Sequence, residues 1–235
     1  MRTVFIADAH LKGLDDPNQK SLVEFLDKLK ADNLVVLGDL FDFWTGGNKV
    51  VLRNYRPVLD SLLRLTKRGT KIIYLEGNHD FDMGRFFTKD LKASVYTESA
   101  DLTIDNKRFY LAHGDMVSMT TGYTVWRAFL RSPFYRVIAW LATPYGVWSI
   151  ADRLSKNSRK KSRKHKRDGS AIDIRLKEFA GVKISDGFDC VVFAHSHVAG
   201  VQVLGKAVYA NPGSWLERNY LVYDGRQFRV ERHKG

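Results

Sequence analysis

The chain has 235 residues, of which 44% are hydrophobic, so it is long enough to bury one sizeable core, and its length favours one domain over two. Its single cysteine, Cys190, excludes an internal disulfide and precedes Val191, Val192 and Phe193, a run typical of a buried strand. The apolar N-terminal run is too short for a signal peptide and is interrupted by Asp8. We therefore expect a cytoplasmic protein, and no apolar run is long and uncharged enough to span a bilayer.

The formal net charge of +12 is concentrated in one stretch of the chain. Residues 151–170 hold nine Lys or Arg against two Asp, which gives this stretch a net charge of +7. A basic block is most often a solvated face, but it also suits nucleic acid, an anionic membrane or a phosphorylated substrate. Composition alone leaves these partners open.

Apolar runs alternate with amphipathic stretches in the N-terminal half. Strands are predicted at 3–7, 34–37, 71–75 and 108–112. Two helices are predicted between the first three strands, from apolar residues at helical spacing: Leu22, Phe25, Leu26 and Leu29, then Leu59, Leu62, Leu63 and Leu65. This order predicts a largely parallel sheet with helices on its faces.

The C-terminal part has a different pattern. Short runs at 200–204, 206–210, 220–223 and 227–232 are separated by glycine and turn residues. We interpret them as an antiparallel meander that completes a second sheet. The chain is therefore expected to form a single domain over 1–235.

The segment from Tyr123 to about residue 167 interrupts this alternation and is interpreted as a helical insertion, about 120–170. It lacks strand signals, is rich in aromatic residues, and contains Pro133 and Pro144, which should break its helices into short pieces. The aromatic residues could pack on the sheet or face lipid.

Five short polar motifs each follow the end of a predicted strand. They are Asp8-Ala9-His10, Gly38-Asp39-Leu40-Phe41-Asp42, Gly77-Asn78-His79-Asp80, His113-Gly114-Asp115 and His195-Ser196-His197. Ligands bind outside the carboxyl ends of strands in open α/β sheets, so we expect the motifs to converge in space. In an extended backbone, period-two geometry would put Asp8 and His10 on the same side.

In this order the motifs read D-x-H, G-D-x-x-D, G-N-H-D, H-G-D and H-x-H, which resembles the signature of the calcineurin-like metallophosphoesterases. The resemblance implies an α/β fold in which two mixed β-sheets pack as a sandwich flanked by helices. It also implies two divalent metal ions, with Asp39 bridging them. The implied ligands are Asp8, His10 and His197 for the first ion and Asn78, His113 and His195 for the second.

The ligand types agree with this chemistry. Carboxylate, imidazole and amide groups suit Mn²⁺, Fe²⁺ or Zn²⁺ and lack the thiolates of structural zinc sites, and Mn²⁺ is our first expectation. The family pattern further implies that His79 acts on the leaving oxygen and that Asp80 orients its imidazole. Asp42 and Asp115 are expected to support the ligands or to act as local turn or cap residues.

Within the family, the chain resembles the lipid A pathway hydrolases that split the pyrophosphate of a UDP-linked diacyl sugar. The features that carry this resemblance are the compact length, the 38–42 motif, the Asp80-Phe81 to Arg85-Phe86 run and the insertion. The resemblance implies that the insertion is a helical cap that binds substrate through Tyr123, Trp126, Phe129, Asn157, Ser158, Lys161 and Lys164. We then expect a peripheral protein on the anionic surface of the inner membrane.

Two other functions fit parts of the sequence. In a nucleotide or nucleic-acid phosphodiesterase, the basic block would bind phosphates and the metal ligands would be the same. A non-catalytic binding module is the third alternative, but such modules typically lose ligands, and every ligand of the pattern is present here.

Overall fold

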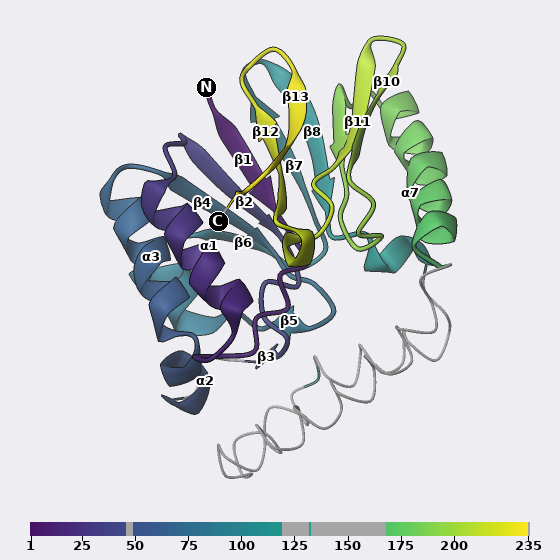
Figure 1. Cartoon of the computed structure of the whole chain (residues 1–235). Coiled ribbons are helices and arrows are strands. Elements are labelled where there is room, and N and C mark those ends of the chain that lie inside the picture. The colour runs from purple at the N-terminus through teal and green to yellow at the C-terminus, as the bar shows by residue number, and fades with distance from the viewer. Residues whose placement is uncertain (46–48, 119–131, 133–167, 235) are drawn as a thin grey trace.

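The computed structural model describes residues 1–45, 49–118, 132 and 168–234. In these residues two β-sheets pack face to face, with helices on their outer faces (Figure 1). This arrangement confirms the predicted α/β fold of two mixed sheets flanked by helices.

The first sheet contains six strands in the order β13, β12, β1, β2, β4, β6. Four of them are parallel: β1 (Thr3–Ile6), β2 (Asn33–Leu37), β4 (Lys71–Leu75) and β6 (Ser94–Tyr96). Strands β1 and β2 are buried along their whole length, as their continuous apolar runs predict for strands covered on both faces.

Helices α1 (Pro17–Lys28) and α3 (Arg56–Lys67) cover the outer face of this sheet, and the short helix α2 (Lys49–Asn54) packs against α3. Helix α1 begins at Pro17 because Asp16 caps it, accepting a hydrogen bond from the Asn18 N–H at 2.9 Å. Side chains such as Leu22 and Leu62 pack with Val4 in one buried cluster. Both helices predicted between the first strands are therefore confirmed.

The second sheet contains five strands in the order β10, β11, β9, β8, β7. Their bounds are Ser99–Ile104 for β7, Lys107–Ala112 for β8, Cys190–Val192 for β9, Gly200–Leu204 for β10 and Ala207–Asn211 for β11. Helix α7 (Asp168–Ser185) covers its outer face through Leu176 and Ala180, which pack against Val191 and Tyr209.

Alternate side chains divide the strands between two cores. In β1, Val4 and Ile6 pack toward the helices, whereas Phe5 packs toward the second sheet with Phe109 and Val192. Residues of both sheets share the buried core between them. The carboxyl ends of β1, β2 and β4 in the first sheet therefore lie near those of β8 and β9 in the second.

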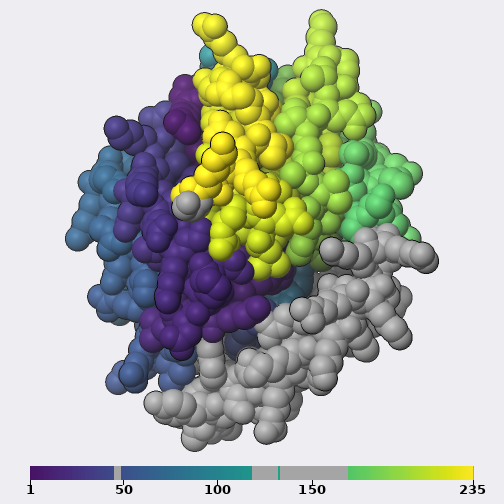
Figure 2. Space-filling view, viewed as in Figure 1, coloured from purple at the N-terminus to yellow at the C-terminus, as the bar shows by residue number. Residues whose placement is uncertain are grey.

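The prediction of one C-terminal meander in the second sheet is wrong. Strands β10 and β11 do join that sheet, but β12 (Asn219–Tyr223) and β13 (Phe228–Arg232) join the first sheet, where β12 pairs antiparallel with β1. Figure 2 shows the yellow C-terminal residues beside the purple N-terminal ones. Short apolar strands of this kind do not reveal which sheet edge they pair with.

Several short elements complete the described chain. They are β3 (Trp44–Thr45), β5 (Asp80–Phe81), a π-helix η1 (Phe86–Asp90) and the 3-10 turns η2 (Asp115–Ser118) and η3 (Trp215–Glu217). The expected helical insertion lies outside the described residues. In the described part of the chain, no helix has the length and apolar character to cross a membrane.

Candidate metal centre

The five motifs converge at one edge of the two sheets. Each follows the carboxyl end of β1, β2, β4, β8 or β9, and backbone hydrogen bonds connect neighbouring loops. The N–H of His10 donates to the carbonyl of Asp39 at 3.0 Å, and the N–H of Ala194 donates to the carbonyl of His113 at 3.0 Å. The loops from both sheets therefore form one continuous site.

The backbone turns sharply at the ligand positions. Asp8, His10, Asp39, His195 and His197 all have φ between 44° and 63°. The expectation of an extended Asp8-Ala9-His10 segment is therefore wrong, although both side chains still reach the same place. Non-glycine residues in this left-handed region carry strain and cluster at functional sites.

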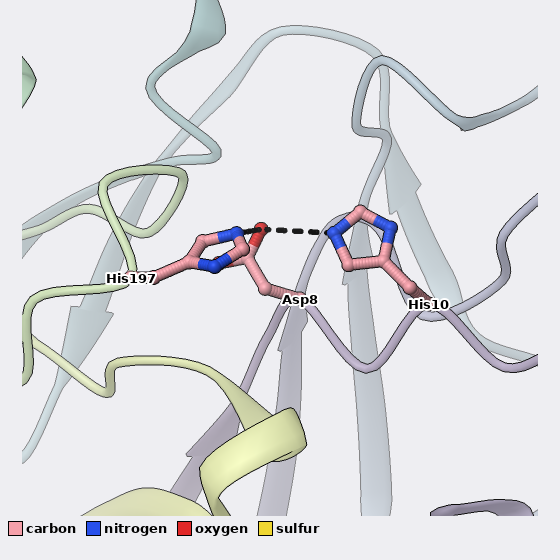
Figure 3. Close-up of side chains that lie close together, drawn as sticks. All are labelled: Asp8, His10 and His197. Carbon is pink, nitrogen blue, oxygen red and sulfur yellow. Dashed lines mark ion pairs between the residues drawn. The ribbon is translucent and has the colours of Figure 1, made fainter. Parts of the chain in front are cut away.

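Asp8 lies between two imidazoles (Figure 3). Its Oδ1 atom is 3.3 Å from Nε2 of His197 and 4.0 Å from Nε2 of His10. Among the described residues no donor makes a hydrogen bond to this buried oxygen, whereas Oδ2 accepts from the N–H of His195 at 3.0 Å. A buried carboxylate oxygen that faces two imidazoles and accepts no hydrogen bond suits a cation shared with them, because a buried charge is costly unless it is compensated.

A second group of candidate ligands lies around His113. Its Nε2 atom is 3.2 Å from Oδ1 of Asn78, 3.2 Å from Nδ1 of His195 and 3.5 Å from Oδ2 of Asp39. Its Nδ1 atom is 2.7 Å from the carbonyl of Leu37, an acceptor, so Nδ1 carries the proton. Nε2 is then the nitrogen that can bind a metal.

Asp39 lies between the two groups. Its Oδ2 atom is 3.8 Å from Nε2 of His10 as well as 3.5 Å from Nε2 of His113, and its Oδ1 accepts from the N–H of His79 at 2.9 Å. Two glycines make room for it: a Cβ on Gly77 would overlap Asp39, and one on Gly38 would lie 2.8 Å from Nδ1 of His113. Both positions therefore need glycine.

The buried groups strongly perturb one another. Burial raises the pKa of Asp39, but the imidazoles of His113 and His79 outweigh burial and hold this pKa well below its ordinary value. Burial lowers the pKa of His10 to about 4 and that of His195 to about 4. Burial acts the same way on His113, but neighbouring carboxylates, chiefly Asp39, raise its pKa well above the usual 6.5.

The residues present fit divalent cations. Among the described residues, ligand atoms of Asp8, His10 and His197 lie within 4.8 Å of one another, as do those of Asp8, Asp39 and His113. They offer carboxylate oxygens and imidazole nitrogens, and Asn78 adds an amide oxygen. This set matches first-row divalent ions and contains no thiolate.

Asp80 has different partners from those expected. Its carboxylate accepts hydrogen bonds from the N–H groups of Asp39 at 2.9 Å, Leu40 at 2.6 Å and Gly77 at 3.0 Å, and it also contacts the Phe41 N–H and the Tyr74 hydroxyl. Asp80 therefore joins the β2 and β4 loops.

The imidazole of His79 is held by another residue. Its Nδ1 atom lies 3.0 Å from the carbonyl of Asp42, so the backbone of the 38–42 loop orients the ring. The side chains of His79, Asp42 and His10 also form a group with ligand atoms within 4.8 Å. Asp42 and Asp115 are both buried beside the site.

Sequence reasoning missed the residues that support the motif loops. Ser214 donates its hydroxyl to the carbonyl of Asp8 at 2.7 Å, and Nδ2 of Asn211 donates to the carbonyl of Ala194 at 3.2 Å. Both belong to the polar run Asn211-Pro212-Gly213-Ser214, which also follows a strand end and could have been found by that signal. Asp173 of helix α7 contacts the Ser196 hydroxyl in the H-x-H turn. It does not follow a strand end, so the sequence pattern did not point to it.

The expected substrate-binding residues lie outside the described residues. These are Tyr123, Trp126, Phe129, Asn157, Ser158, Lys161 and Lys164. Their part in binding stays a prediction from the sequence.

The family model described as calcineurin-like phosphoesterase matches residues 1–199, and the chain belongs to this family. This family membership, together with the similarity to proteins named as hydrolases, identifies the chain as a metal-dependent phosphoester hydrolase. The UDP-2,3-diacylglucosamine hydrolase of Porphyromonas gingivalis is 25% identical over 97% of this chain and 95% of its own. The enzyme of that name from Aeromonas salmonicida is 34% identical over 59% of this chain and 59% of its own.

A solved archaeal phosphodiesterase has the same fold. It aligns over 98% of this chain and 99% of its own with a TM-score of 0.51, at 14% sequence identity. This likeness supports the two-sheet fold described above.

Proposed function

We propose that the chain hydrolyses the pyrophosphate of UDP-2,3-diacylglucosamine, giving 2,3-diacylglucosamine 1-phosphate and UMP. The relatives that bear this enzyme name, over most of the chain's length, support the substrate. The observation that carries the hydrolytic part is the placement of Asp39 between two groups of ligand atoms.

We assign two divalent cations to these groups, with Mn²⁺ as the first expectation and Fe²⁺ or Zn²⁺ as alternatives. Asp8, His10 and His197 would hold one ion, and Asn78, His113 and His195 the other. Asp39 would contact both. Two such ions lower the pKa of a water and offset charge on the phosphoryl oxygens.

The surrounding residues prepare the site for this chemistry. Leu37 fixes the tautomer of His113 through its carbonyl, so Nε2 faces the ligand group. The carbonyl of Asp42 accepts from Nδ1 of His79, which fixes the ring; when both ring nitrogens carry a proton, Nε2 of His79 would donate its proton to the leaving oxygen and the ring would return to its neutral form. Asp80 holds the β2 and β4 loops together and so fixes Asp39 relative to Asn78.

Substrate recognition is assigned to the insertion. Tyr123, Trp126 and Phe129 would contact the acyl chains, and the polar and basic residues would contact the sugar and phosphates: Asn157, Ser158, Lys161 and Lys164. An enzyme acting on this lipid would work at the cytoplasmic face of the inner membrane, where the basic block of residues 151–170 would meet anionic headgroups.

The test is turnover of UDP-2,3-diacylglucosamine beside simple nucleotides and a chromogenic phosphodiester, each in Mn²⁺. We expect rapid release of UMP from the lipid substrate and slow hydrolysis of the others. Asp39→Ala should abolish turnover of all three, which excludes a contaminating enzyme. Faster turnover of nucleotides or nucleic acid than of the lipid would instead support the phosphodiesterase alternative.

A further inference from the structure

The H-x-H turn needs support from outside itself. Its two histidines, His195 and His197, have φ of 63° and 60°, and Ser196 lies between them. Non-glycine residues keep this conformation only where the surrounding structure holds it. The contacts of Ser196 show what holds the turn.

The hydroxyl of Ser196 is buried at the centre of a small polar network. Its oxygen accepts from the N–H of Val198 at 3.3 Å and from Nδ2 of Asn211 at 3.1 Å. The Asn211 side chain also donates to the carbonyl of Ala194 at 3.2 Å. The network therefore connects the residue before the turn with the residue after it.

Asp173 of helix α7 completes the network. Its Oδ1 atom accepts from the Ser196 hydroxyl at 3.5 Å and from the Tyr209 hydroxyl at 3.1 Å, and its Oδ2 is 2.8 Å from Nζ of Lys177. An ionised carboxylate can only accept hydrogen bonds, so Ser196 is the donor in the 3.5 Å contact with Asp173. The lone pairs of the Ser196 oxygen are then left for Val198 and Asn211.

Helix α7 also contacts the backbone of the same turn. A Cβ on Gly169, in the first turn of α7, would lie 2.9 Å from the carbonyl oxygen of Ser196. Figure 1 shows α7 alongside the sheet that ends in this turn. The helix thus approaches Ser196 both through its backbone and through a buried carboxylate.

We propose that Asp173 is a positioning residue for His195 and His197, acting through the hydroxyl of Ser196. Helix α7 then sets the geometry of two ligands that belong to different metal ions. This inference rests on the proposed function, because it takes both histidines as metal ligands.

The test measures Mn²⁺ affinity in four variants of the metal-free full chain. Asp173→Ala and Ser196→Ala should weaken binding of at least one ion by about 10–100-fold, as loss of residues that orient ligands usually does. Tyr209→Phe and Lys177→Ala are the matched controls. Each removes one contact to the same carboxylate but leaves Ser196 paired, so both should bind Mn²⁺ like the unmodified protein.

Three further measurements separate positioning from a loss of folding. Ser196→Thr keeps the hydroxyl and should keep the affinity, and the double variant Asp173→Ala/Ser196→Ala should be no weaker than the weaker single variant. Thermal unfolding of the metal-free proteins gives stability independently. If Ser196→Ala and Asp173→Ala lower the unfolding temperature yet bind Mn²⁺ normally, the positioning role is wrong. If the unmodified protein binds no Mn²⁺, the proposed function fails first and this inference with it.

Discussion

Gly77 provides a test of the proposed bridging role of Asp39 in which no ligand residue is itself substituted. A Cβ at residue 77 would overlap Oδ1 of Asp39 and would lie 2.6 Å from its backbone nitrogen and 2.9 Å from its Cγ. Gly77 is not among the glycines with positive φ, so alanine there would not add the strain of a left-handed conformation. The effect of Gly77→Ala therefore comes from contact with Asp39.

The local structure leaves little room for adjustment. The N–H of Gly77 donates to Oδ1 of Asp80 at 3.0 Å, and the same oxygen accepts from the N–H of Asp39 at 2.9 Å, so the two loops are held together. Overpacking of this kind costs about 1–3 kcal/mol of stability. A catalytic group displaced by about 1 Å can lose about 100-fold in rate, so we expect kcat to fall by about that factor.

The assay is hydrolysis of a chromogenic phosphodiester in saturating Mn²⁺, with metal content measured on the same sample. Gly181→Ala is the matched control, because Gly181 lies in α7 and its added Cβ would meet no atom within 4 Å. This control should keep full activity and gain up to about 1 kcal/mol of stability. Full activity with normal metal content in Gly77→Ala would refute the reasoning.

Three other predictions follow from the site and the sequence. His79→Ala should keep both ions and lose most activity on substrates with poor leaving groups; an equal loss on nitrophenyl esters would count against its role as proton donor. Despite burial, neighbouring carboxylates, chiefly Asp39, raise the pKa of His113 in the metal-free protein, so metal binding should release a proton and weaken as pH falls; calorimetry in buffers of different ionisation enthalpy checks this, and no proton release would contradict it. Co-sedimentation with anionic liposomes should fall when Trp126 and Phe129 are made polar, and also when five basic residues are neutralised: Arg159, Lys160, Lys161, Arg163 and Lys164. Equal sedimentation of the unmodified protein with neutral and anionic vesicles would exclude membrane docking.

The position of the site could be predicted from the sequence because it follows from strand order. Runs such as 34–37 and 72–75 are aliphatic or aromatic throughout, and parallel strands of this kind place their carboxyl ends at one edge. Each polar motif directly follows such a run. The convergence of the five motifs could therefore be predicted without knowing any side-chain contact.

The geometry within the site could not be predicted in the same way. The left-handed backbone at Asp8 and His10 depends on hydrogen bonds to the Gly38 and Asp39 carbonyls of another loop. The pairing of His79 with the carbonyl of Asp42, in place of Asp80, likewise depends on how two loops meet. Such contacts join residues far apart in sequence, and no local pattern encodes them.

The sequence also did not reveal which sheet the C-terminal strands join, or that helix α7 supports the site. The 220–223 run is apolar and could be buried in either sheet. Its pairing with β1 therefore depends on the path of the preceding loop. Helix α7 was not predicted, and without it the buried Asp173 had no visible role. Both features follow from tertiary packing, which overrides weak local signals.

The most direct test of the two-metal assignment is a titration of the metal-stripped protein with Mn²⁺ while hydrolysis of a chromogenic phosphodiester is followed. Activity should be absent without metal and should reach its plateau at about two equivalents, since Asp39 would serve both ions. Full hydrolysis without metal, or a plateau at one equivalent with no second ion bound, would contradict the assignment.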